Sequence, residues 1–312
     1  MTHIHYFHHV QVQGGHGRLL ALMLLLSLWL SAWAQDVTVV VASDLHFDRP
    51  PETDQYYHVR AINALGKTIP IDAVLLCGDI FDKASPDIQA LFKQRYEPGP
   101  GDKTIHYPVY MLYGNHDISP ENGRPNLNKR GYELNMRYLD SLLQVGKARG
   151  DIYHVDPSSR SYSFNLGGVH FVMGMLAAGD TSYCKSNFDW LEADLKMYCS
   201  DGTPVVYLQH YGFDKWARGW WPEAHRARLM ALLDRYNLAA FMVGHTHEAS
   251  VQRYKGHRIY QVNNAWPDDD GSASFAVLSI KGKKVSIRTV QVLDGDGHYR
   301  WVKPTVETTL LK

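Results

Sequence analysis

Residues 37–46 read VTVVVASDLH. Val37 to Val41 form a continuous β-branched run, which predicts a strand buried on both faces. The run leads into Asp44-Leu45-His46, where a carboxylate and an imidazole are two residues apart. Side chains at i and i+2 of an extended segment point to one face, so this pair can hold one cation with an oxygen and a nitrogen. Alone, such a short pattern also occurs by chance.

Four further strand candidates also end in potential metal ligands. These segments are Gly78-Asp79-Ile80-Phe81-Asp82, Gly114-Asn115-His116-Asp117, His210, and Gly244-His245-Thr246-His247. Each has an ordinary alternative explanation: Asp82 as a helix N-cap, Asn115 as a turn residue, His210 as a hydrogen-bonded core histidine. Because loops at the carboxyl ends of strands in α/β sheets converge on one crevice, the five segments together predict a metal site.

The order of elements predicts an α/β fold in which two sheets pack as a sandwich with helices. The first half alternates strands and helices, and the part after His247 is all β. The strands expected are 37–41, 72–77, 108–112, 161–165, 169–173, 205–208, 239–243, 258–262, 274–280 and 284–292. The helices expected are 57–65, one that opens at 85–86, 132–145, 186–196 and 222–236.

The first 34 residues have the features of an export signal. Arg18 precedes an apolar run, Leu19 to Leu30, and Ala32 and Ala34 supply an A-x-A cleavage site. Leu19 to Ala34 is 16 residues, short of the ~20 that span a bilayer, although an uncleaved anchor is the alternative. We therefore expect a cleaved signal peptide (1–34), a single domain (35–312), and a periplasmic or extracellular protein, or one in a lysosome-like compartment if the source is eukaryotic.

Composition limits the partners. Lys plus Arg and Asp plus Glu number 32 each, so no net field draws the protein to nucleic acid, and any affinity for anions must be local. We expect a monomer.

Cys184 and Cys199 flank the helix expected at 186–196, whose ends lie about 15 Å apart at about 1.5 Å per residue. Because a disulfide needs Cα atoms within about 7 Å, this spacing argues against pairing.

The five segments match the blocks D-x-H, G-D-x-x-D, G-N-H-D/E, H and G-H-x-H. In this the chain resembles the calcineurin-like metallophosphoesterase superfamily over roughly 37–292. The resemblance implies a four-layer αββα sandwich with two metal ions. It places Asp44, His46 and His247 on one ion, Asn115, His210 and His245 on the other, and Asp79 between them. It also places His116, oriented by Asp82, at the leaving-group oxygen.

The implied reaction is hydrolysis of a phosphate monoester or diester. Two cations about 3.5–4 Å apart lower the pKa of a bridging water and so supply hydroxide near neutral pH. The mixed nitrogen and oxygen ligands suit Mn, Fe, Zn or Co. Purple acid phosphatases have a tyrosinate where this chain has Asp82, so a coloured ferric centre is not implied. The alternative is a catalytically silent metal- or phosphate-binding protein of the same fold.

Two loops are candidates for contact with a phosphorylated small-molecule or lipid substrate. The loop after His210 carries aromatic and cationic side chains, namely Lys215, Trp216, Arg218, Trp220 and Trp221. Its tryptophans could instead seal the loop onto the core. The segment 118–130 follows His116 directly and carries Arg124, Lys129 and Arg130, so it is either a second specificity loop or an ordinary surface loop.

Overall fold

A computed structural model describes residues 36–48, 55–82, 84–118, 129–181, 183–266 and 273–310, without the side chains of residues 129 and 130. Residues 35–312 belong to one compact unit. The expected signal peptide lies outside the described residues, as do Arg124 and the side chains of Lys129 and Arg130. Within the described part of the chain, every helix is too short or too polar to cross a membrane.

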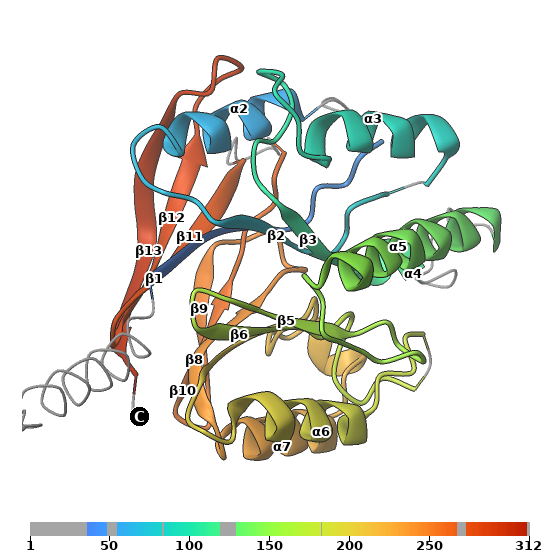
Figure 1. Ribbon diagram of the computed structural model, residues 1–312, viewed down its shortest axis with the longest axis vertical. Helices are drawn as coiled ribbons and strands as arrows, with labels where there is room; N and C mark the ends of the chain where they lie inside the picture. Colours follow the sequence, from blue (N-terminus) through green and yellow to red (C-terminus); the bar gives the residue numbers. More distant parts are fainter. Residues whose placement is uncertain are drawn as a thin grey trace, which may run out of the picture. The chain divides into compact units, whose positions relative to one another are not determined.

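The first sheet has six strands in the order β13-β12-β11-β1-β2-β3 (Figure 1). Strands β1, β2 and β3 are parallel, whereas β11, β12 and β13 continue the sheet antiparallel from β1. Their bounds are β1 Asp36–Ala42, β2 Ala73–Cys77, β3 Val109–Leu112, β11 Ser274–Lys281, β12 Lys284–Val292 and β13 Tyr299–Thr309.

The second sheet has seven strands in the order β4-β5-β6-β7-β8-β10-β9. Strands β6, β7, β8 and β10 run parallel, and antiparallel neighbours extend the sheet at both edges. Their bounds are β4 His154–Val155, β5 Tyr162–Leu166, β6 Val169–Met173, β7 Pro204–Leu208, β8 Asn237–Val243, β9 Ser250–Tyr254 and β10 His257–Gln261.

Helices flank the two sheets. In Figure 1, α2 and α3 lie beside the first sheet, and α6 and α7 beside the second. Helix α3 begins where expected because Ser85 Oγ accepts a hydrogen bond from Ile88 N at 3.2 Å, and Asn187 caps α6 in the same way. The bounds are α2 Tyr56–Leu65, α3 Pro86–Tyr96, α4 Asn115–Ile118, α5 Lys129–Arg149, α6 Phe188–Cys199, α7 Glu223–Leu233 and the 3₁₀ turn η1 Ala217–Gly219. The predicted two-sheet sandwich with flanking helices is confirmed.

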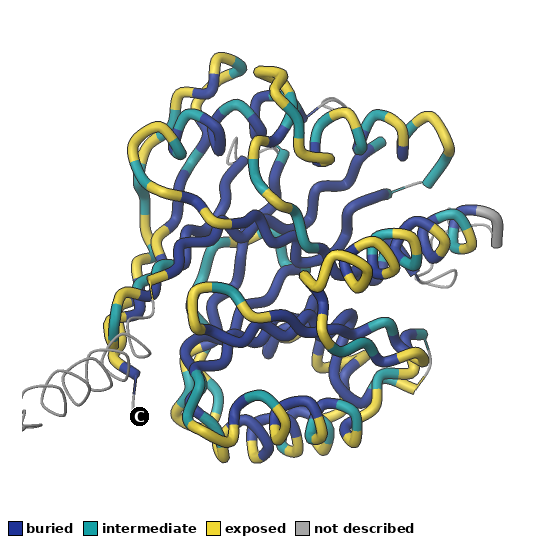
Figure 2. Tube along the Cα trace, viewed as in Figure 1, coloured by how far each residue is buried: buried dark blue, intermediate teal, exposed yellow. Residues whose placement is uncertain are grey.

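Most residues of the central strands are buried, as Figure 2 shows in dark blue. Val39, Val40 and Val41 have no exposed surface. Three strands, β4, β9 and β13, were not predicted. Strand β13 is an edge strand with mostly exposed or half-exposed side chains and an internal Pro304, so it lacks the apolar run that marks an inner strand.

The three cysteines, Cys77, Cys184 and Cys199, are all buried and free. This agrees with the spacing argument against a Cys184–Cys199 bridge, because Cys184 precedes α6 and Cys199 is its last residue.

Candidate metal centre

The carboxyl ends of β1, β2, β3, β7 and β8 bring all seven predicted ligands together. Their donor atoms form two groups, each with atoms within 4.8 Å of one another: Asp44, His46 and His247, and Asp79, His210 and His245. Asn115 adjoins the second group, since its Oδ1 lies 3.1 Å from His210 Nε2. Segments separated by up to about two hundred residues of sequence thus form one cluster.

The first group is centred on two imidazoles. Nε2 of His46 and Nε2 of His247 are 3.0 Å apart, and His247 Nε2 lies 3.4 Å from Asp44 Oδ1. The Asp44 carboxylate also accepts a hydrogen bond from the backbone N–H of His245 at 2.9 Å. Asp44 therefore ties the loop after β1 to the loop after β8.

Asp79 lies between the two groups. Its Oδ2 is 3.2 Å from His210 Nε2 in the second group and 3.9 Å from His46 Nε2 in the first. Its Oδ1 accepts the backbone N–H of His116 at 2.8 Å, which fixes the orientation of the carboxylate. This is the placement that a ligand shared by two cations requires.

His116 lies at the edge of the cluster. Its Nδ1 is 3.0 Å from Asp82 Oδ1, and its ring centroid is 4.7 Å from that of His46. The same carboxylate oxygen lies 3.4 Å from His46 Nδ1. Asp82 therefore contacts both a predicted metal ligand, His46, and the predicted proton donor, His116.

The backbone that carries these ligands is strained. Asp44, His46, Asp79, His245 and His247 all have positive φ, between 46° and 86°. Such a conformation costs a non-glycine residue roughly 1–2 kcal/mol, and clusters of strained residues are typical of functional sites. The sharp turns at the strand ends require it, because they aim successive side chains back at one point.

Two glycines allow the loops to approach one another. Gly78 has φ of 92°, and a Cβ there would lie 2.5 Å from His210 Nδ1. A Cβ on Gly114 would overlap the carboxylate of Asp79. Larger residues at these positions would displace the ligands.

Asp117 has a positional function that the sequence did not reveal. Its fully buried carboxylate accepts backbone N–H groups from Gly114 at 2.8 Å, Phe81 at 2.9 Å and Ile80 at 3.2 Å. Burial, together with the charge of Asp79, raises the pKa of Asp117 to about 7. The carboxyl group thereby joins the loop after β2 to the loop after β3. Its only sequence signal is an acid directly after Asn115-His116.

The protonation states fit metal binding. Burial lowers the pKa of His46 and of His245 to about 4, so both rings are neutral at pH 7 and have a lone pair to donate. Burial would raise the pKa of Asp44, but its contact with His247 lowers the pKa to about 2. Burial would lower the pKa of His210, but its contact with Asp79 raises it to about 9, so this ring carries a proton that a metal ion would displace. The ionised Asp44 carboxylate and the neutral imidazoles of His46 and His245 suit transition-metal ions.

His210 provides a geometric test of the same point. Its Nδ1 lies 2.9 Å from the carbonyl oxygen of Cys77, and as the donor to that oxygen Nδ1 carries the proton. Nε2 points toward two acceptors, Asp79 Oδ2 at 3.2 Å and Asn115 Oδ1 at 3.1 Å. A proton on Nε2 or a metal ion among these three atoms balances the charge of Asp79, so these residues fit a metal ion.

Comparison with known proteins is consistent with this geometry. The family model for calcineurin-like phosphoesterases matches residues 37–249. The chain belongs to the calcineurin-like phosphoesterase family. No match was found among curated protein sequences.

Solved structures share the fold of this family member. A dimetal phosphatase from Danio rerio is 13% identical with a TM-score of 0.55, over 88% of this chain and 98% of that one. Purple acid phosphatase PPD1 from yellow lupin is 16% identical with a TM-score of 0.58, over 89% of this chain and 54% of that one. GAP50, described as the anchor in the inner membrane complex of Plasmodium, is 13% identical with a TM-score of 0.52, over 89% and 90%.

The five predicted substrate residues occupy different places. Trp221 is 1% exposed and donates its Nε1–H to the carbonyl of Ala178, so it holds the loop onto the core. Trp220 is 55% exposed, and its ring centroid lies 5.5 Å from that of His245. Lys215, Trp216 and Arg218 are exposed, and Lys215 Nζ lies over the Trp216 ring. Of the five, Trp220 alone has a ring contact with a predicted ligand within the described residues.

A second tryptophan, Trp266, was not anticipated. Its ring centroid lies 5.7 Å from that of His247 and 6.2 Å from that of His46. Trp266 adjoins the first group, whereas Trp220 adjoins the second, so an indole lies beside each group. No motif surrounds Trp266 in the sequence.

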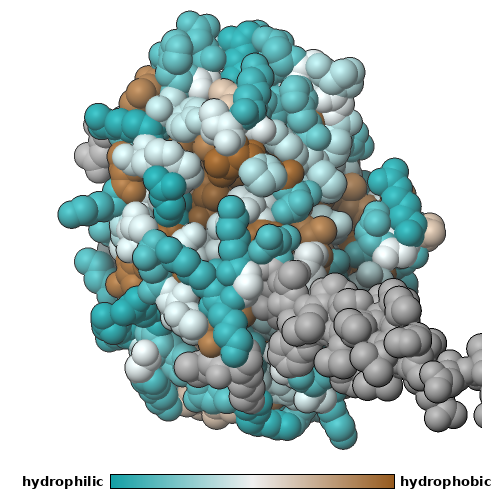
Figure 3. Space-filling view, turned by 60° about the vertical axis from the view of Figure 1, so that its left-hand side comes forward, coloured by the Kyte–Doolittle hydropathy of each residue, from teal (hydrophilic) through white to brown (hydrophobic). Residues whose placement is uncertain are grey.

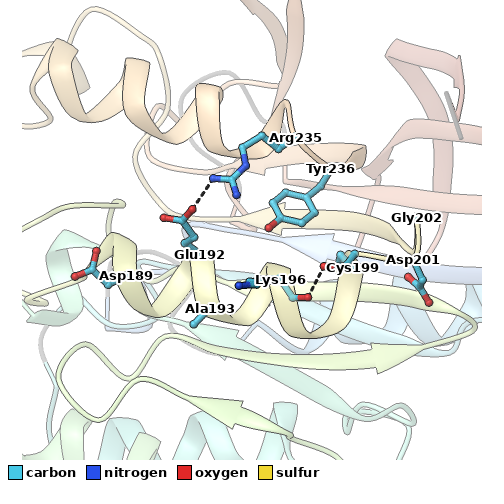
Figure 4. A pocket seen from close by; sticks show the side chains of 10 residues that line it. Asp189, Glu192, Ala193, Lys196, Cys199, Asp201, Gly202, Arg235 and Tyr236 are labelled. Atoms are coloured by element: carbon cyan, nitrogen blue, oxygen red, sulfur yellow. Dashed lines mark hydrogen bonds and ion pairs between the residues drawn. The ribbon is translucent and has the colours of Figure 1, made fainter.

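Two pockets on the surface contain none of the predicted ligands. One, of about 770 Å³, runs along α6, where Arg235 pairs with Glu192 at 2.5 Å (Figure 4). Its charges are mixed and already partly paired. The other, of about 250 Å³, is lined by residues that include Val277 and Trp301 of β11 and β13. On the face of the molecule that carries β12 and β13, apolar and hydrophilic side chains are intermixed (Figure 3).

Proposed function

We propose that the protein is a metal-dependent phosphoesterase that hydrolyses phosphate monoesters or diesters with two transition-metal ions of the Mn, Fe, Zn or Co type. The observation that carries the proposal is the position of Asp79, within 3.9 Å of an imidazole in each of the two ligand groups. Asp44, His46 and His247 would hold one ion, and Asn115, His210 and His245 the other, with Asp79 common to both. When bound, such ions supply Lewis acidity toward phosphoryl oxygens and lower the pKa of water.

Charge explains how a protein with no net charge attracts an anion. The ionised carboxylates of Asp44 and Asp79 contribute two negative charges, whereas His46 and His245 are neutral. Two divalent cations would contribute four positive charges. The loaded site therefore has a positive surplus, which favours a phosphoester over a neutral ester. This attraction is local, as the balanced composition requires.

His116 would protonate the leaving-group oxygen. Asp82 lies against Nδ1, which leaves Nε2 as the nitrogen that transfers the proton. Asp82 also fixes the orientation of the ring. A positioned acid of this kind contributes about 10²–10⁴-fold to rate.

The proposal is tested with purified residues 35–312 loaded with Mn²⁺ or Zn²⁺. Elemental analysis should find about two ions per chain, and p-nitrophenyl phosphate or bis(p-nitrophenyl) phosphate should be hydrolysed. Two bound ions without turnover of any phosphoester would instead support a silent metal- or phosphate-binding protein. Absence of bound ions would contradict both the phosphoesterase and a metal-binding protein.

We further propose that the protein is exported and that its signal peptide is removed after Ala34. The supporting feature is the apolar run 19–30 followed by the A-x-A signal at Ala32 and Ala34. Intact-mass measurement of protein expressed with its own leader would give the mass of residues 35–312. Recovery of the full-length mass from a membrane fraction would point to an uncleaved anchor.

A further inference from the structure

A cavity of about 310 Å³ lies beside the first ligand group and has no role in the mechanism above. His247 forms part of its wall. The rest of the wall comes from separate segments: Glu248 after β8, Asn263 after β10, Ser274 at the start of β11, Gln291 of β12 and Lys303 of β13. The match to the family model ends at residue 249, before Asn263, Ser274, Gln291 and Lys303.

The cavity is on the same rim as the metal centre because of strand direction. Strand β11 runs antiparallel to β1, so its first residues lie at the carboxyl end of β1. The register pairs Val41 of β1 with Ala276 of β11. Ala276 is two residues after Ser274, and Val41 is three residues before Asp44. A group bound in the cavity would thus be next to a phosphoryl group held at the ligand cluster.

The wall offers hydrogen-bonding atoms. Ser274 is 3% exposed, and its Oγ has no hydrogen-bond partner among the residues that the structure describes. Gln291 Oε1 accepts a hydrogen bond from Arg300 Nε at 2.8 Å, which leaves the amide nitrogen of Gln291 as a donor. A buried hydroxyl without a partner is costly, and a ligand that supplies one would relieve that cost.

The charges in the wall cancel. Lys303 and Glu248 are exposed, and neither forms an ion pair within the described ranges. One ammonium and one carboxylate give the cavity no net charge, so it does not favour a second phosphate. The polar side chains also disfavour an acyl chain.

We propose that this cavity binds the leaving group of the phosphoester and that this group is a polyhydroxylated ring, a sugar or a cyclitol. A hydroxyl both donates and accepts, so a ring of hydroxyls matches a wall that mixes amide, hydroxyl, ammonium and carboxylate groups. Ala249 and Val302 add apolar surface for its C–H face. The volume is near the lower end of small-molecule sites, about 300–1,000 Å³, which suits one ring. This inference rests on the proposed phosphoesterase function.

The kinetic test compares myo-inositol 1-phosphate with phenyl phosphate. We expect kcat/KM to be at least about tenfold higher for the inositol ester. Gln291→Ala and Lys303→Met should each raise KM for the inositol ester about three- to tenfold, the range for one hydrogen bond, and change kcat/KM for phenyl phosphate less than about twofold. Lys281→Met, at the far end of β11, is the matched control and should change neither.

A binding measurement keeps the proposal testable apart from turnover. Saturation-transfer NMR with free myo-inositol should give a signal with the metal-loaded protein, and Gln291→Ala should weaken it. Equal kcat/KM for both esters, equal effects of the variants on both, or no myo-inositol signal would overturn the inference while leaving a phosphoesterase intact. Failure of every phosphoester to react would instead overturn the proposed function.

Discussion

Oδ1 of Asp82 lies 3.0 Å from Nδ1 of His116. The side chain of Asp82 is 12% exposed and that of His116 is 20% exposed, so the pair lies at the boundary between the ligand cluster and solvent. A carboxylate on one ring nitrogen fixes the tautomer and the orientation of the imidazole. The first prediction depends on this contact.

Replacing His116 should slow the reaction without removing metal. His116→Ala should lower kcat on an alkyl phosphate by about 10²–10⁴-fold, because a poor leaving group needs a proton. The loss on p-nitrophenyl phosphate should be smaller, since nitrophenolate leaves without one. His106→Ala, at an exposed histidine, is the control. Equal losses on both substrates would contradict the assignment of His116 as an acid.

Gly114 should be required for metal binding. In Gly114→Ala the new methyl group would overlap the carboxylate of Asp79, which must then move away from both ligand groups. We expect fewer than one ion per chain by elemental analysis and at least a tenfold loss of activity. Gly219→Ala is the matched control, because a Cβ at Gly219 meets no described atom within 4 Å. Full metal content in Gly114→Ala would be incompatible with a shared Asp79.

Removal of metal should destabilise the fold. A ligand present at 100 times its Kd stabilises the native state by about 2.7 kcal/mol per site. For a domain of this size 1 kcal/mol corresponds to about 2–4 °C in Tm, so chelation at one such site should lower Tm by about 5–10 °C. Calorimetry with and without a chelator measures this, and restoring Mn²⁺ or Zn²⁺ should recover Tm. An unchanged Tm would argue against tight binding.

His58 should make the protein sensitive to acid independently of the metal centre. Its ring is buried in α2, its Nδ1 lies 2.9 Å from the hydroxyl oxygen of Tyr96, and burial lowers its pKa from 6.5 to about 4. Between these values the unfolded chain binds a proton that the folded chain does not, so stability falls as pH falls from about 6.5 to 4. At about 1.4 kcal/mol per unit the loss reaches about 3 kcal/mol.

The variant His58→Gln tests whether His58 causes this loss of stability at low pH. Glutamine does not titrate, so the free energy of urea unfolding of the wild type relative to the variant should be constant above pH 7.5. It should then decrease by about 3 kcal/mol on going to pH 4. Parallel pH profiles for the two proteins would show that His58 contributes nothing to acid sensitivity.

Trp220 should contribute to binding on the side of the second ligand group. Its exposed indole lies beside His245 and stacks on Tyr211 with centroids 5.8 Å apart. Trp220→Ala should raise KM for bis(p-nitrophenyl) phosphate about three- to tenfold, because an aromatic contact contributes about 0.5–1.5 kcal/mol. Trp216→Ala, at an equally exposed tryptophan, should have less than a twofold effect. The opposite ranking would place the substrate elsewhere on this loop.

Some parts of the fold could be predicted from the sequence, and others could not. The two-sheet architecture was predictable because inner strands such as 37–41 and 239–243 are apolar runs whose burial follows from composition alone. Strand β13 was missed because an edge strand pairs on one side only and tolerates charge and Pro304. Likewise Trp220 and Trp221 are neighbours in sequence, yet one is exposed beside His245 and the other is buried.

The sequence by itself determined the family and the seven predicted ligands, whose assignment to metal ions stays a prediction. It could do so because each ligand follows a strand directly, so local sequence fixes both its residue type and its place at a strand end. Only the tertiary structure decided the surroundings: the contacts of Asp117, the indole of Trp266, and the cavity shared by Ser274, Gln291 and Lys303. These depend on packing between distant segments of ordinary composition, and no local pattern records which segments will meet.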